Sequence, residues 1–359
     1  MKKKKILNYL WLFIPLLVLI IISLINMKIA GNFQSMYKNY FFKQSIWFLI
    51  GFIILILMKF IRPKLLFKYS FLLYYFNIIL LILVLFFGKT INGSRAWFNF
   101  GLFSFQPSEL MKFTLALYLS KKASSMAKGN LKKEFKFIIT SIFITLIPSL
   151  FVFLEPDTGA IIIYLLILLG IVLIYRINYK WYIILFIALA LLFGSFFYLY
   201  YFNKDLLIKL IGTSFFYRVD RLLTFITGDS FQLDRALISI GSSSLFGNNN
   251  HLYIPEAPTD FIIAFSISNF GIFGFLIIIM SYFILDIYFF YKLLKSKNPK
   301  NKMFIASFLC MFIFAQIENI GMNLGILPII GLPLPFLSYG GTNTIVYFLF
   351  LGTIINSDK

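Results

Sequence analysis

Residues 319–343 have the sequence NIGMNLGILPIIGLPLPFLSYGGTN, and this stretch decides the fold. It holds five glycines, three prolines and no charged residue, between segments apolar enough to span a bilayer. Pro328, Pro333 and Pro335 remove backbone donors, and glycines such as Gly331 permit dihedral angles that other residues avoid. Irregular backbone at membrane depth is stable only where protein or a wet cavity covers it. The stretch is therefore predicted to line a site within a membrane protein.

The composition of the whole chain supports this class. Hydrophobic residues make up 60% of the 359 residues, aromatic residues 20%, and the mean hydropathy is +0.90. The apolar runs are continuous and do not alternate with polar residues, which predicts an all-α polytopic membrane protein and not a barrel. A single cysteine, Cys310, excludes a disulfide within the chain, and a single histidine, His251, argues against a histidine metal site.

Ten apolar runs predict about ten transmembrane helices. They lie near residues 9–26, 46–61, 66–87, 107–120, 137–153, 160–175, 181–202, 261–290, 303–320 and 341–356. The longest polar interruption, at about residues 203–260, is expected to form a large extracytoplasmic loop between spans 7 and 8. No appended soluble domain is evident, so residues 1–359 are expected to form one membrane domain.

The distribution of charge predicts the orientation. Ten spans place both ends of the chain on one side of the membrane. That side would carry most of the 33 Lys and Arg residues but only Glu134, Asp286 and Asp358 of the 13 acidic residues. Basic residues concentrate on cytoplasmic segments, so both termini are expected in the cytoplasm. The net charge of +20 is then largely topological, and nucleic acid is not an expected partner. The first apolar run lacks a cleavage site and is expected to be an uncleaved anchor.

The segments rich in polar residues, glycine and proline all fall on the outer side. They are NGSRAW at 92–97, FQPSELMK at 105–112, EPDTG at 155–159 and PEAPTDF at 255–261, followed by the stretch at 319–343. In this order they closely resemble the signatures of the SEDS family (shape, elongation, division and sporulation), typified by RodA and FtsW. The resemblance covers nearly the whole chain, and the NIGM form of the last signature leans toward a RodA-like, elongation role.

The resemblance implies a function. SEDS proteins are glycosyltransferases of the bacterial cytoplasmic membrane that polymerise lipid II into glycan strands and release polyprenyl pyrophosphate. They contribute to cell shape, division and cell-wall biogenesis. The implied partners are lipid II, the nascent glycan strand, membrane lipids and a class B penicillin-binding transpeptidase. A divalent cation such as Mg or Mn beside the pyrophosphate stays open, because no metal ligand set is visible in the sequence.

Asp260 is the residue that the resemblance assigns to catalysis. Pyrophosphate is already a good leaving group, so no protonating acid is needed, in contrast to glycoside hydrolysis, where two carboxylates share the work. What remains is a base that takes the proton of the acceptor hydroxyl, and direct displacement inverts the anomeric carbon. The local sequence alone favours a different role for Asp260, as the N-cap of the following helix.

A dianionic pyrophosphate also needs cations, and four outer residues are candidates: Arg95, Lys112, Arg218 and Arg221. The two arginines at 218 and 221 could equally face solvent or lipid headgroups. Lys112 lies inside a span, where ions are costly and commonly functional. A purely structural pair with Glu109 is the alternative.

Further candidates are polar residues of the other outer signatures. Asp157 either supports the site or belongs to an exposed turn. Asn319 and Asn323, four apart on one helical face, either meet sugar hydroxyls or pack against a neighbouring helix. Ser338 belongs to the last signature and is included as a substrate-binding candidate.

Several residues depart from the family pattern, and Ser242, Ser243 and Ser244 stand in place of a glycine-rich run. Pro258 replaces a histidine, and Ser268 and Asn269 replace two acids. Two other functions stay in view. A flippase for the same lipid-linked precursor would need a path to the cytoplasmic side, and a scaffold for division or elongation complexes would tolerate loss of Asp260.

Overall fold

The computed structural model describes residues 2–91, 94–101, 103–126, 130–213, 216, 230–248 and 253–357. Within these residues, each of the ten predicted apolar runs forms a long helix. The helices are α1 (Lys2–Phe33), α2 (Tyr40–Met58), α3 (Pro63–Phe87), α4 (Pro107–Ser125), α5 (Leu131–Leu154), α6 (Thr158–Tyr175), α7 (Tyr179–Phe202), α11 (Ile262–Lys295), α12 (Pro299–Asn323) and α13 (Gly341–Asn356). The prediction of an all-α polytopic protein is confirmed.

Seven of the described helices are long and apolar enough to cross a membrane on their own: those at Tyr9–Phe33, Ser35–Met58, Pro63–Phe87, Leu131–Leu154, Thr158–Tyr175, Ile262–Lys295 and Pro299–Asn323. Helix α13 is apolar but shorter. Helix α4 carries Glu109 and Lys112 in its first turns, and it lies inside the bundle against α3, α6, α12 and α13. Burial among other helices explains how a helix with charged residues can span the bilayer.

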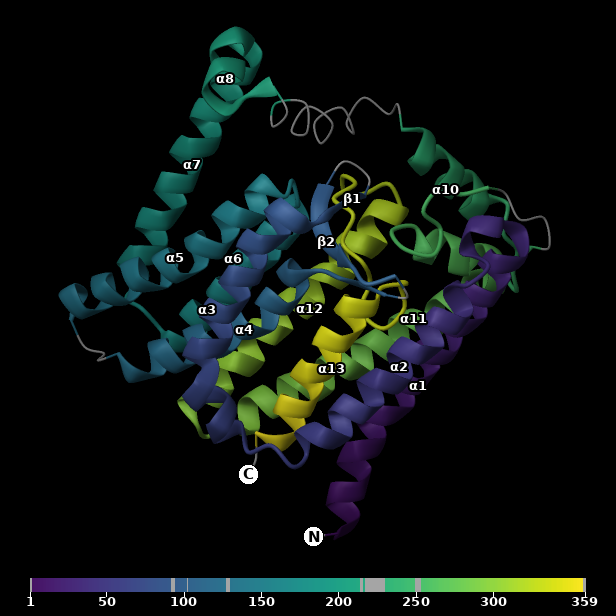
Figure 1. Cartoon of the computed structure of the whole chain (residues 1–359), viewed down its shortest axis with the longest axis horizontal. Coiled ribbons are helices and arrows are strands. Elements are labelled where there is room, and N and C mark those ends of the chain that lie inside the picture. The colour runs from purple at the N-terminus through teal and green to yellow at the C-terminus, as the bar shows by residue number, and fades with distance from the viewer. Residues whose placement is uncertain are drawn as a thin grey trace.

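Both termini lie at one end of the bundle, and the shorter elements lie at the opposite end (Figure 1). We call the latter the cavity end. It carries the 3-10 helix η1 (Ser35–Tyr37), helices α8 (Lys204–Ile211) and α10 (Phe231–Gly241), and an antiparallel sheet of three strands. The strands are β1 (Lys89–Ile91), β2 (Ser94–Asn99) and β3 (Ser104–Phe105), with Phe98 opposite Phe105. The sequence analysis predicted no strands here, because segments of two to six residues are too short to show a periodic pattern.

Helices α6 and α12 pack closely because glycine lies where they cross. A Cβ atom added at Gly170 would lie 2.6 Å from the carbonyl oxygen of Ala306. Helices α2 and α13 meet in the same way, since a Cβ atom at Gly51 would lie 2.2 Å from the ring of Phe348. Small residues allow helix backbones to approach closely where lipid supplies no hydrophobic driving force between them. These contacts hold α12 and α13 in place, and the irregular stretch 324–340 connects the two.

Candidate functional site

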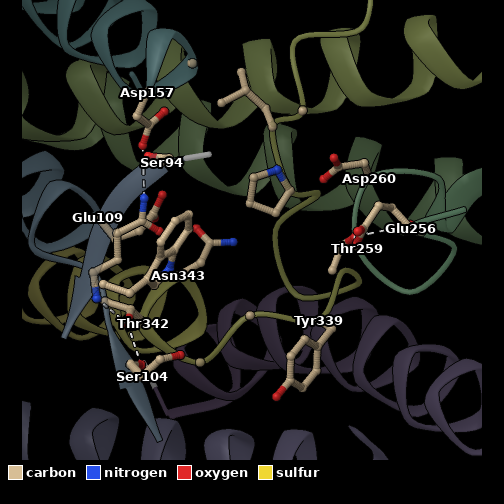
Figure 2. Close-up of a pocket in the computed structure, with 18 of the residues that line it drawn as sticks. Ser94, Ser104, Glu109, Asp157, Glu256, Thr259, Asp260, Tyr339, Thr342 and Asn343 are labelled. Carbon is tan, nitrogen blue, oxygen red and sulfur yellow. Dashed lines mark hydrogen bonds between the residues drawn. The ribbon is translucent and has the colours of Figure 1, made fainter. Parts of the chain in front are cut away.

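A cavity of about 690 Å³ opens at the cavity end of the bundle. Its walls are built from segments that are far apart in the chain: the start of α2, strands β2 and β3, the start of α4, the turn at 156–160, the loop at 256–260 and residues 330–333 and 339–343. Figure 2 shows polar side chains from these segments converging on one space. Within the stretch 319–343, the lining residues lie between Ile330 and Asn343, and residues 319–329 do not line the cavity.

Asp260 lines this cavity, and Figure 2 shows its carboxylate pointing inward. No group among the described residues hydrogen-bonds to that carboxylate. The N-cap of α11 is Phe261, without a side-chain cap, so the capping role that the local sequence favoured is not the one observed. Burial, and secondarily the charge of Glu256, raises the pKa of Asp260 to about 7. The carboxylate is therefore poised to exchange a proton near neutral pH.

Two buried asparagines hold the backbone of Asp260 in place. The amide groups of Asn319 and Asn323 donate to its carbonyl oxygen at 3.0 and 2.9 Å. The Asn319 amide also donates to the carbonyl of Leu332 at 2.9 Å, and the oxygen of Asn323 accepts from Ala264 N at 2.9 Å. Both side chains are fully buried and neither lines the cavity. Both side chains therefore contact the backbone behind the cavity and do not face it, which agrees with the packing alternative, and a role in positioning Asp260 is a prediction.

Ser338 and Glu318 also form hydrogen bonds to the backbone, and both bind groups of the irregular stretch 324–340. Ser338 Oγ donates to the carbonyl of Thr259 at 2.6 Å and accepts from Leu334 N at 2.9 Å. Glu318, to which the sequence analysis gave no role, accepts from Ile330 N at 3.2 Å. Both side chains are buried and outside the cavity lining, so Ser338 contacts the backbone behind the cavity and does not face it.

Glu256 is a cavity residue that sequence reasoning missed. Its backbone has φ of 51°, which is unusual for a residue with a side chain. Thr259 Oγ1 donates to its carboxylate at 2.9 Å, and both side chains line the cavity (Figure 2). The signal in the sequence was an acid four residues before Asp260 in a proline-bounded loop.

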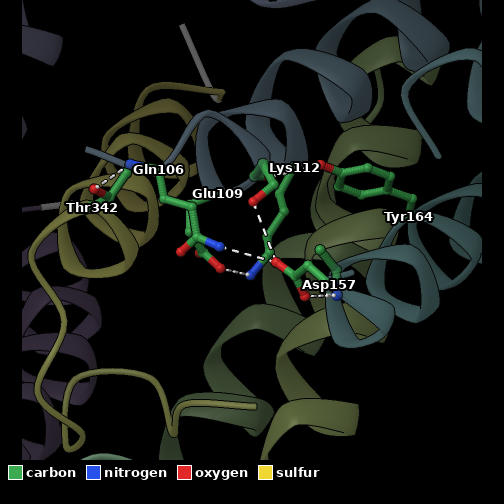
Figure 3. A network of polar contacts seen from close by, with 8 residues as sticks. Gln106, Glu109, Lys112, Asp157, Tyr164 and Thr342 are labelled. Carbon is green, nitrogen blue, oxygen red and sulfur yellow. Dashed lines mark hydrogen bonds and ion pairs between the residues drawn. The ribbon is translucent and has the colours of Figure 1, made fainter. Parts of the chain in front are cut away.

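The start of α4 carries a network of polar contacts with the turn before α6 (Figure 3). Lys112 Nζ lies 2.6 Å from Glu109 Oε1, and both side chains are buried. Gln106 Nε2 donates to Asp157 Oδ2 at 3.0 Å, while the other oxygen of Asp157 caps α6 through Ala160 N at 3.0 Å. Glu109 and Asp157 line the cavity, but Lys112 does not. Asp157 therefore both lines the cavity and caps α6.

Of the remaining cationic candidates, only Arg95 belongs to the described residues, and it does not line the cavity. Arg95 Nη1 donates to the carbonyl of Leu85 at 3.2 Å, and its side chain is exposed and outside the cavity lining. Arg218 and Arg221 lie outside the described residues. Lys43 of α2, by contrast, lines the cavity. The sequence analysis counted it only as a charge on the outer side.

The residues that depart from the family pattern have structural contacts. The carbonyl of Pro258 accepts from Tyr339 N at 2.8 Å, which ties the Asp260 loop to the stretch before α13. Asn269 donates to Asn26 Oδ1 at 2.8 Å and links α11 to α1. Among the described residues, no three His, Cys, Asp or Glu side chains lie together as metal ligands would, so no ligands are assigned to a divalent cation.

Comparisons with known proteins agree with this architecture. The family model described as "Cell cycle protein", which covers FtsW, RodA and SpoVE, matches residues 3–359. The chain is 29% identical to the "Probable peptidoglycan glycosyltransferase FtsW" of Coxiella burnetii, over 94% of this chain and 91% of that protein. It is 27% identical to the "Peptidoglycan glycosyltransferase MrdB" of Helicobacter pylori strain 26695, over 88% of this chain and 82% of that protein.

Solved structures show the same fold. A chain from the work described as "Structural coordination of polymerization and crosslinking by a peptidoglycan synthase complex" superimposes with a TM-score of 0.80, at 25% identity over 97% of both chains. The Rod shape determining protein RodA of Thermus thermophilus superimposes with a TM-score of 0.70, at 24% identity over 97% of this chain and 96% of that one. Because the family model spans all but the first two residues, this multi-pass membrane protein belongs to the FtsW/RodA/SpoVE family, the SEDS family of the sequence analysis.

Proposed function

We propose that this protein is an inverting peptidoglycan glycosyltransferase that polymerises lipid II into glycan strands. The observation that carries the proposal is the carboxylate of Asp260, which points into a cavity of about 690 Å³ with no hydrogen-bond partner among the described residues. The names of the relatives, which include FtsW and MrdB glycosyltransferases, support the same reaction.

The chemistry follows from the position of this base. Asp260 accepts the proton of the acceptor sugar hydroxyl while its oxygen attacks the anomeric carbon of the donor. The bond from that carbon to the pyrophosphate oxygen breaks, and polyprenyl pyrophosphate leaves as an anion without needing a proton. Attack from the face opposite the leaving group inverts the anomeric carbon. A base with a pKa of about 7 is well matched to this task near neutral pH.

We further propose that the cavity end faces outward from the bacterial cytoplasmic membrane and both termini face the cytoplasm. The excess of basic residues on the segments at the termini end supports this orientation. A class B penicillin-binding transpeptidase is the proposed partner. The superposition on a chain from a complex that coordinates polymerization and crosslinking supports it.

The direct test supplies the purified protein with fluorescent lipid II and separates the products on a gel. A ladder of glycan polymers is the expected result. If the protein instead carried lipid II across the bilayer of a vesicle without forming polymer, it would be a flippase. The residues that line the cavity all lie at the cavity end, which favours the transferase.

A further inference from the structure

The proposed reaction has one requirement that none of the predicted candidates within the described residues meets. The leaving group is a pyrophosphate, and an anion in a partly buried cavity needs a cation that can bind it directly. Lys112 is buried against Glu109 and does not line the cavity, and Arg95 is turned toward the carbonyl of Leu85. Neither of these expected candidates offers a free positive charge to the cavity.

Lys43 offers one. It lies in the first turn of α2 and is the only lysine or arginine among the described residues that line the cavity. No hydrogen bond or ion pair engages its ammonium group within the part of the chain that the structure describes. The other charged residues that line the cavity carry carboxylates: Glu109, Asp157, Glu256 and Asp260. Because carboxylates repel an anion, Lys43 is the charged lining residue among the described residues that can attract a pyrophosphate.

The residues beside Lys43 form a continuous face. Tyr40 lies three residues before it and Trp47 four residues after it, so all three project from one side of α2. All three also line the cavity. A cation with an aromatic ring about one turn away on each side suits a sugar phosphate. The rings offer apolar surface to the sugar, and the Tyr hydroxyl and Trp N–H offer polar contacts at the edge.

Packing holds this face of α2 in a fixed position. The ring of Tyr40 stacks on Tyr339 with centroids 3.9 Å apart and planes at 15°. Trp47 lies so close to Gly341 that an added Cβ atom would be 2.3 Å from the indole ring. Gln44, fully buried, accepts a hydrogen bond from Gly340 N at 3.3 Å. The face is therefore anchored to the stretch that connects α12 to α13. That stretch also passes close to Asp260, since a Cβ atom added at Gly331 would lie 3.2 Å from its carboxylate oxygen.

We propose that Tyr40, Lys43 and Trp47 form the subsite for the pyrophosphate and the adjoining sugar of a lipid-linked donor, with Lys43 binding the pyrophosphate. This inference rests on the proposed function and names the residue that receives its leaving group. Lys43 and Asp260 are far apart in the sequence but line one cavity. A donor whose phosphates are bound near the base requires this arrangement.

Binding of the product tests the subsite without requiring turnover. Purified wild-type protein, Lys43→Gln and Lys43→Arg are titrated with polyprenyl pyrophosphate and with polyprenyl monophosphate in detergent. Lys38→Gln is the matched control, because Lys38 lies five residues earlier, is exposed and does not line the cavity. Loss of one hydrogen bond to a charged group typically weakens binding about 10- to 100-fold. We expect this loss for Lys43→Gln with the pyrophosphate, a smaller loss for Lys43→Arg, and none for Lys38→Gln.

Protection from labelling gives a second test that needs no variant of Lys43. An amine-acylating reagent is applied to the wild-type protein with and without polyprenyl pyrophosphate, and labelled peptides are quantified by mass spectrometry. Protection of Lys43 but not Lys38 is expected. Equal labelling of Lys43 with and without the pyrophosphate, or wild-type affinity in Lys43→Gln, would overturn the subsite.

The inference and the proposed function fail separately. Asp260→Asn should still bind polyprenyl pyrophosphate through Lys43 although it makes no polymer. An active Asp260→Asn would refute the assigned base, and the binding data would still decide the role of Lys43.

Discussion

Replacing Glu256 with Gln should shift the pH dependence of polymerisation. The carboxylate of Glu256 is the second cause, after burial, that raises the pKa of Asp260 to about 7. A neighbouring negative charge disfavours the ionised form of an acid, so removing it lowers the pKa of Asp260. The base then stays ionised at lower pH. Glutamine keeps the geometry, because its amide oxygen can still accept the hydrogen bond from Thr259.

The expected size follows from the titration of one group. A fall of about one unit in the pKa of Asp260, a common effect of a nearby charge, would leave it near pH 6. At pH 6 the ionised fraction would rise from about one tenth to about one half. For each protein, the rate at pH 6 is divided by the maximal rate that the same protein reaches at high pH. This ratio should be about five-fold larger for Glu256→Gln than for wild type. The maximal rate itself should be lower in the variant, since a weaker base is a poorer proton acceptor.

Single-turnover polymerisation is measured between pH 5 and 9 on the same lipid II. The measurement gives the pH at which the rate falls to half of its maximum on the acid side of the profile. The variant leaves unchanged Glu318 on α12, whose charge interacts with that of Asp260, and the other charged residues that line the cavity within the described residues, which are Lys43, Glu109 and Asp157. Asp234→Asn removes an equal charge from an exposed position on α10 and serves as the control. If the rate of Glu256→Gln fell to half of its maximum at the same acidic pH as that of wild type, the coupling of these two carboxylates would be refuted.

Three further predictions concern the supporting structure and the orientation. Lys112→Met should lower thermal stability, because it leaves Glu109 buried and unpaired, at a cost of about 3–5 kcal/mol. The double variant Lys112→Met with Glu109→Gln should recover most of the lost stability. If it does not, the lysine has a role beyond the pair. Asn319→Leu and Asn323→Leu should each lower the polymerisation rate, because each removes a hydrogen bond to the Asp260 carbonyl behind the cavity. Binding of polyprenyl pyrophosphate should stay intact. Unchanged rates would show that the two asparagines do not position Asp260. A reporter active only outside the cytoplasm should work when inserted after Ser243 and stay silent at the C-terminus, and the opposite pattern would reverse the proposed orientation.

The helices could be predicted from the sequence because each depends on a local property. Every one of the ten apolar runs corresponds to a helix, since a continuous run can satisfy its backbone in lipid only that way. The boundaries were less accurate: the run near 46–61 belongs to a helix that begins at Tyr40. The three short strands, and the bend of α11 at Gly271 with φ of 68°, left no periodic signal.

The site could be predicted only in part, because its roles depend on tertiary contacts. The sequence placed Asp260, Glu109 and Asp157 on one side of the membrane, and the structure brings all three to one cavity. It did not show that Asn319 would face the backbone of Asp260 and not the substrate. Lys43 was not singled out because counting charges treats each lysine alike. Its proposed role depends on its place in the cavity lining and on its having no partner among the residues that the structure describes.

The central claim is that Asp260 is the catalytic base, and the most direct measurement compares Asp260→Asn with wild type in the lipid II gel assay. Asparagine keeps the shape of the side chain but cannot accept the proton. At equal amounts of folded protein, and with polyprenyl pyrophosphate binding unchanged, Asp260→Asn should produce no polymer. Polymer at the wild-type rate in that variant would contradict the mechanism.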